Sequence, residues 1–113
     1  MDKKIMNLTN RIKTYLKKIY GKKIKKVILY GSYARNNATK DSDIDLLVIV
    51  DDTLNPSEVR KSLSDLLFNI ILEEKELVSV IAIPEHFFDN YNAPFILNVK
   101  GEGVAVWKKY MIL

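Results

Sequence analysis

Two apolar runs on either side of a polar stretch constrain the fold more than any other feature of the sequence. Residues 27–30 lead into Gly31-Ser32, and ten residues after this pair comes Asp43-x-Asp45, followed by the apolar residues 46–50. Short apolar runs bounded by turn residues are typical of buried strands. The pattern therefore predicts a strand before and a strand after a connection that carries the polar residues.

The two aspartates and the Gly-Ser pair have spacings that suit phosphate chemistry. In an extended strand Asp43 and Asp45 project to one face, about 6 to 7 Å apart. Two carboxylates that converge repel each other unless a cation lies between them, and such oxygen ligands favour Mg²⁺ or Mn²⁺ over zinc. Gly31 permits a tight turn, and Ser32 offers a hydroxyl and an N–H to a phosphate. Nucleotidyl transfer from a nucleoside triphosphate requires this combination.

Each half of this pattern also has a simpler interpretation. A Gly-Ser pair alone is usually a turn, and Asp-x-Asp alone is often a solvated strand entrance. The functional interpretation depends on the ten-residue spacing and on the flanking strands.

The segment Gly31-Ser32-x10-Asp43-x-Asp45, with Ala34-Arg35 after the serine and Ser42 before the first aspartate, resembles the signature of the DNA polymerase β-like nucleotidyltransferase superfamily. The short chain is most similar to the minimal nucleotidyltransferases, the MNT antitoxins that are paired with HEPN toxins. The resemblance implies one minimal nucleotidyltransferase domain over residues 1–113. Asn36 stands where the family often has glycine, and asparagine tolerates a left-handed backbone.

The resemblance also implies an activity: Mg²⁺-dependent transfer of AMP from ATP, or of NMP from another triphosphate, to a hydroxyl. Asp43 and Asp45 are then the catalytic residues and the ligands of two Mg²⁺ ions. Gly31 and Ser32 bind the nucleotide, and Arg35 either supports its phosphates or supports only the local fold. The implied acceptor is a tyrosine of a HEPN toxin, which makes this chain the antitoxin.

A third metal-site carboxylate, where such enzymes have one, comes from a neighbouring strand. Glu76 is the nearest acidic residue, and it is either that ligand or a solvated strand entrance. The strand interior offers Ser79 in place of an acid.

Two other functions stay open. The chain could neutralise a partner by binding alone, or it could modify a small molecule such as an aminoglycoside, if a homodimer completed the cleft. A nucleic-acid acceptor is a weaker third, because the lysines of residues 1–26, which hold ten of the 18 basic residues, lack interleaved aromatics for base stacking. This basic segment is more typical of a solvated helix face.

The remaining sequence predicts a small α+β (α/β) fold without membrane spans. The longest apolar run, residues 46–50, is far shorter than the roughly 18 residues of a span, no signal-peptide pattern is visible, and no cysteine is present, so we expect a cytoplasmic protein. Helices are expected at 3–20, from 55–58 to 73–75, at 85–89 and from 92–95 to a turn at 101–103. A mixed sheet of three to four strands is expected from residues 27–30, 43–50, 76–83 and 104–107, with an apolar tail to residue 113.

Overall fold

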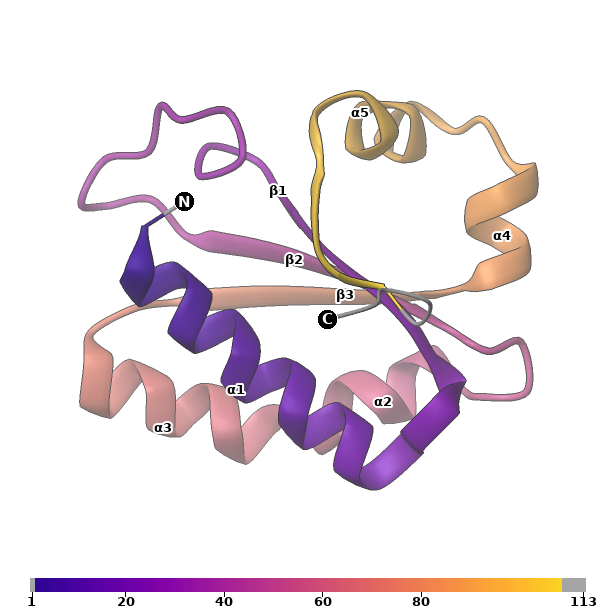
Figure 1. Ribbon diagram of the computed structural model, residues 1–113, viewed down its shortest axis with the longest axis horizontal. Coiled ribbons are helices and arrows are strands. Elements are labelled where there is room, and N and C mark those ends of the chain that lie inside the picture. Colours follow the sequence, from indigo (N-terminus) through magenta and orange to yellow (C-terminus); the bar gives the residue numbers. More distant parts are fainter. Residues whose placement is uncertain (1, 109–113) are drawn as a thin grey trace.

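Helices and strands make up most of residues 2–108, the part of the chain that the computed structural model describes (Figure 1). The order is α1 (Lys3–Tyr20), a 3-10 turn η1 (Gly21–Lys23), β1 (Ile24–Tyr30), β2 (Ile44–Val50), α2 (Pro56–Ser62), α3 (Ser64–Glu74), β3 (Val78–Pro84), α4 (Glu85–Asn90), α5 (Pro94–Glu102) and β4 (Val104–Lys108). Within these residues no helix is long and apolar enough to cross a membrane.

The strands form one mixed sheet in the order β3-β2-β1-β4. β1 pairs with β2 and with β4 in antiparallel fashion, whereas β2 and β3 are parallel. The expected α+β class and the mixed sheet are confirmed, and the sheet has the larger of the two expected strand numbers. β2 lies inside the sheet and is buried along nearly its whole length, as its apolar sequence predicts.

Helix α1 shows directly how the sequence dictates an element. The Asp2 side chain caps it by accepting hydrogen bonds from the backbone N–H groups of Lys4 (2.6 Å) and Ile5 (3.4 Å). Gly21, with φ of 56°, ends it. The predicted helix over residues 3–20 is confirmed, and its apolar stripe is buried except for Ile19, which is exposed.

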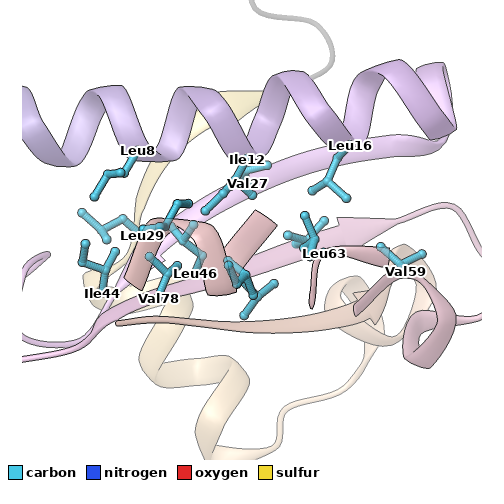
Figure 2. Close-up of a cluster of buried hydrophobic side chains, with 14 of the residues drawn as sticks. Leu8, Ile12, Leu16, Val27, Leu29, Ile44, Leu46, Val59, Leu63 and Val78 are labelled. Carbon is cyan, nitrogen blue, oxygen red and sulfur yellow. The ribbon is translucent and has the colours of Figure 1, made fainter. Parts of the chain in front are cut away.

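The two faces of the sheet are covered by different helices (Figure 1). Helices α1, α2 and α3 cover one face and enclose the larger core, in which Leu8, Ile12 and Leu16 of α1 face the strand residues Val27 and Leu46 (Figure 2). Helices α4 and α5 cover the other face over a smaller cluster of buried residues: Ile28, Leu47, Ile49, Phe88, Ile96 and Val99. Because strand residues alternate between faces, Tyr30 and Asp45 belong to this second face.

The single helix expected between residues 55 and 75 is wrong, because the chain forms two helices that meet at Leu63. The Asn55 side chain caps the first of them, accepting hydrogen bonds from the N–H groups of Ser57 and Glu58. At the junction the buried Leu63 adopts φ of −87° and ψ of −8°, outside regular α-helix geometry. In the second helix the apolar side chain of Ile71 is exposed.

Several other boundaries differ by a few residues. β1 begins at Ile24, earlier than the expected start at residue 27, while β2 and β3 begin at Ile44 and Val78, slightly later than predicted. α5 continues to Glu102 through the expected turn. Residues 33–37 form a turn, one of the two expected forms. The edge strand at residues 104–107 is confirmed, whereas the expected apolar tail at residues 109–113 lies outside the described residues.

Candidate functional site

The connection between β1 and β2 consists of two hydrogen-bonded turns. In the first, the Arg35 N–H donates to the Gly31 carbonyl (3.1 Å) and the Asn37 N–H to the Ser32 carbonyl (3.0 Å). Asn36 supplies the left-handed residue with φ of 65°, so asparagine does support the turn.

The second turn, at residues 39–42, leads directly to Asp43. The Ser42 N–H donates to the Thr39 carbonyl (3.1 Å), and the Thr39 N–H donates to the Ser42 hydroxyl (2.8 Å). These bonds fix the direction from which the chain enters β2. Asp43 therefore lies at the head of the strand, one residue outside it.

Gly31 and Asp45 are in direct contact across the strand pair. Tyr30 is the register partner of Asp45, so Gly31 follows at the end of β1 beside the carboxylate. Gly31 has φ of 76°, and a Cβ at this position would collide with Asp45 Oδ2. Glycine is thus required here for its backbone conformation and for the space that the carboxylate occupies.

Asp43 and Asp45 form a pair of like charges with different environments. Asp43 is exposed and Asp45 is half-buried. Burial raises the pKa of the Asp45 carboxyl above its ordinary value, the Asp43 carboxylate raises this pKa further, and the Arg35 guanidinium opposes both effects. The predicted aspartate pair is therefore close enough for mutual repulsion, which a bound cation would relieve.

Arg35 and Tyr30 flank the Gly-Ser turn, and helix α5 contacts both. Arg35 Nη1 lies 2.9 Å from Glu102 Oε1 at the end of α5. The Tyr30 ring packs edge-on against Phe95 in the first turn of α5, with 5.4 Å between ring centroids. Burial, followed by the charge of Asp45, raises the pKa of the Tyr30 hydroxyl. The structure thus brings Gly31, Arg35 and Asp45 close to one another.

Glu76 is not brought to this cluster. Its carboxylate forms an ion pair with Lys4 Nζ at 3.2 Å. The parallel register pairs Asp45 with Ser79, so it is Ser79 that shares the face of Asp45, whereas Glu76 precedes Val78, which faces the α1 side. Within residues 2–108 no group of three Asp, Glu or His side chains is arranged to hold a metal ion.

The donor set nevertheless fits a magnesium site that is completed by the substrate. Asp43 and Asp45 offer hard carboxylate oxygens, and Mg²⁺ in nucleotide enzymes is commonly held by one or two carboxylates together with phosphate oxygens and waters. The close approach of the Gly31 backbone limits the space on one side of Asp45. A triphosphate can then supply the ligands that the described residues do not.

Comparison with known proteins places the chain in a family. A family model described as a nucleotidyltransferase domain matches residues 9–104. The chain belongs to the nucleotidyltransferase domain family, which confirms the resemblance to minimal nucleotidyltransferases seen in the sequence.

A curated relative and two solved structures are similar to this chain. The Methanocaldococcus jannaschii protein named "Putative protein adenylyltransferase MJ0604" is 35% identical over 106 residues, which cover 90% of this chain and all of that protein. A crystal structure described as a putative nucleotidyltransferase from Sulfolobus solfataricus has a TM-score of 0.65 at 20% identity, covering 93% of this chain and 81% of that one. A chain of a toxin-antitoxin structure with AMP-PNP has a TM-score of 0.58 at 19% identity, covering 87% and 72%.

Sequence reasoning missed the part of the site that comes from α5. Glu102 and Phe95 lie far from the Gly-Ser turn in the chain, and no spacing in the sequence connects them with it. The nearest signal is the compact Gly101-Glu102-Gly103 segment, which places an acid between two small residues. The contacts of α5 with the turn are visible only in the structure, where β4, the strand after α5, pairs with β1.

Proposed function

We propose that this chain transfers AMP from ATP to a tyrosine hydroxyl of a HEPN-type toxin and thereby acts as its antitoxin. The observation that carries the proposal is the contact between Gly31 and Asp45, beside Asp43 and Arg35. It combines a tight glycine turn, suited to phosphates, with a dicarboxylate pair in need of a cation. The protein adenylyltransferase named among the relatives, and the toxin-antitoxin structure with AMP-PNP, support the class of acceptor and nucleotide.

Each residue has a separate role in this mechanism. The Gly31 and Ser32 backbone would seat the β- and γ-phosphates, and Arg35 would contribute positive charge on the same side. Asp43 and Asp45 would hold two Mg²⁺ ions, which when bound polarise the phosphate and balance the charge of the leaving group. The tyrosine oxygen gives up its proton to solvent and bonds to the α-phosphorus. The bond from the α-phosphorus to the bridging oxygen breaks, and pyrophosphate leaves. Positioning and electrostatics supply most of the rate in such chemistry.

Labelling with α-³²P-ATP and Mg²⁺ tests this proposal, with the protein encoded beside this gene as acceptor. We expect label on a tyrosine of the acceptor, and no label from γ-³²P-ATP, because the γ-phosphate leaves with pyrophosphate. The Asp43→Asn, Asp45→Asn double variant should lose at least about a hundredfold in rate, since metal-held charge is worth several kcal/mol.

A matched control is Asp41→Asn, which removes one exposed carboxylate from the same connection without touching the pair. It should label the acceptor at the wild-type rate. Equal labelling by wild type and by the double variant would contradict the proposed role of the aspartates.

Neutralisation by binding alone is the second candidate function. It is favoured by Ser79, which lies beside Asp45 at the position where an acidic residue would supply a third carboxylate. In that case the wild-type protein gives no label but still suppresses the toxin. The double variant then suppresses the toxin equally well, which separates the two functions in one pair of assays.

A further inference from the structure

Helix α5 contacts the Gly-Ser turn at both of its ends. At its start, Phe95 packs on Tyr30, which precedes Gly31. At its end, Glu102 pairs with Arg35, which follows Ser32 in the turn. The helix therefore spans the turn and fixes the residues on each side of it.

The position of Glu102 is itself tightly fixed. The next residue, Gly103, donates its N–H to the Val99 carbonyl at 2.7 Å. A Cβ at Gly103 would meet the Val99 carbonyl oxygen at 2.5 Å and Ile28 Cγ2 at 2.7 Å, so the backbone at this point lies directly against β1. The backbone at the end of α5 thus cannot shift towards the sheet, and from this fixed backbone the Glu102 side chain reaches Arg35.

The ion pair leaves most of the guanidinium available. A guanidinium has five N–H donors, and the contact with Glu102 Oε1 uses Nη1. The Arg35 side chain is 46% exposed, so without a partner it would sample many rotamers in solvent. With Glu102 in place its charge acts on Asp45.

We propose that Glu102 is a positioning residue, which holds the Arg35 guanidinium ready for the β- and γ-phosphates of the bound triphosphate. This inference rests on the proposed function. An anchored arginine loses less side-chain freedom when the phosphates arrive, so the ion pair strengthens binding of the triphosphate without contacting it.

Calorimetric titration with ATP and with AMP, both in the presence of Mg²⁺ and without an acceptor, tests the proposal. Glu102→Ala should weaken ATP binding about three- to tenfold, which lies within the range of coupling between neighbouring charged groups. AMP lacks the β- and γ-phosphates, so its affinity should stay at the wild-type value. Glu102→Gln keeps an acceptor oxygen for Arg35 and should lie between wild type and Glu102→Ala.

Dependence on Arg35 separates positioning from a general structural role. In an Arg35→Ala background, the added Glu102→Ala change should weaken ATP binding no further. Glu73→Ala is the matched control, because Glu73 forms a similar exposed pair with Arg11 at 3.2 Å, on the opposite face of the sheet. It should leave ATP affinity unchanged.

Four outcomes would overturn the proposal. Equal ATP affinity for Glu102→Ala and wild type, while Arg35→Ala binds weakly, would show that Arg35 needs no anchor. Tighter ATP binding by Glu102→Ala would show that the pair restrains Arg35 instead of preparing it. Equal losses for ATP and AMP would indicate damage to the fold. Failure of the wild-type protein to bind ATP at all would overturn the proposed function, and this inference with it.

Discussion

Gly31 determines how closely the backbone can approach the candidate metal ligands. Its left-handed φ and the collision that a Cβ would make with Asp45 are two separate reasons for glycine. The same residue therefore serves the turn and the carboxylate.

Gly31→Ala should lower both stability and activity. The left-handed backbone costs roughly 1–2 kcal/mol for alanine, and the displaced Asp45 carboxylate should weaken metal-dependent transfer. Urea unfolding and the labelling assay measure the two effects. Gly21→Ala is the control, because Gly21 also has a positive φ but has no atom within 4 Å of the added Cβ. It should lose stability and keep its activity, and loss of activity in both variants would contradict the role of the contact.

Asp45→Asn is expected to stabilise the protein at neutral pH while abolishing transfer. The pKa of Asp45 is raised in the folded state, so the folded protein favours the protonated form. The stability of the wild-type protein therefore falls as pH rises from the ordinary pKa of an aspartate through the raised pKa of Asp45. Above the raised pKa the loss of stability is complete. Urea midpoints in EDTA should be higher for Asp45→Asn than for wild type at pH 7 and should converge below about pH 3.8. A lower midpoint at pH 7 would contradict this.

Substitution of Asp51 should have the opposite effect on stability in the same unfolding experiment. Hydrogen bonds from Thr53, at 2.9 Å from its N–H and 2.7 Å from its hydroxyl, lower the pKa of the Asp51 carboxyl, and Lys25 adds to this effect. The stability that the Asp51 carboxylate contributes is present above the ordinary pKa of an aspartate. It is lost as pH falls through the lowered pKa. Asp51→Asn should therefore be less stable than wild type at pH 7, with the difference vanishing in acid.

At the scale of elements, α5 is the helix on which the site depends. It combines contacts at both ends with a close approach to β1, and two of its neighbouring glycines differ sharply in their surroundings. A Cβ at Gly103 meets Val99 and Ile28, whereas a Cβ at Gly101 meets nothing within 4 Å.

This difference predicts opposite effects of the same substitution two residues apart. Gly103→Ala should destabilise by about 1–3 kcal/mol, because an added methyl in a packed contact forces the end of α5 away from the sheet. Gly101→Ala should stabilise by about 0.5–1 kcal/mol, because alanine favours the helix. Urea unfolding checks both, and ATP affinity should fall only for Gly103→Ala. The same sign for both variants would contradict the packing described here.

Local patterns predicted the elements of the sheet and the aspartate pair, because strand alternation and turn residues act over a few positions. They predicted α1 from its apolar stripe and from Gly21 at its end, whereas the Asp2 cap was found only in the structure. The break at Leu63 was not predictable, since the apolar spacing runs through it and only packing decides the bend. Glu76 was the candidate for a third carboxylate because it is the nearest acidic residue in the sequence. The register of the parallel strands instead places Ser79 beside Asp45. The role of Glu102 was not predictable either, because its contact with Arg35 joins two segments that are far apart in the sequence.

At the scale of the whole molecule, the site lies at the less heavily packed face. Of the described residues, 17 are buried in the cluster beneath α1, α2 and α3, but only six in the cluster beneath α4 and α5. Regions with fewer buried apolar contacts open at lower free energy. The face that would bind the nucleotide is therefore the one that opens more readily.

Amide hydrogen exchange should reveal this asymmetry. Amides of α5 should exchange faster than those of the middle of α1, and ATP with Mg²⁺ should slow exchange in α5 and in residues 31–43. Mass spectrometry of the exchanged protein measures both effects. Faster exchange in α1 than in α5 would contradict the inference that the face beneath α4 and α5 opens more readily.

The distance in sequence between Arg35 and Glu102 has a consequence for a chain that is still being made. The two residues are 67 positions apart, whereas Gly31 and Asp45 lie within one hairpin. At roughly 5 to 20 residues per second, the ribosome needs roughly 3 to 13 seconds to add Glu102 after Arg35. From the addition of Asp45 onwards the nascent chain holds both aspartates, but its arginine has no anchor until Glu102 has been added. We therefore expect tight capture of the triphosphate only after synthesis has passed α5, so that prematurely terminated chains do not sequester nucleotide.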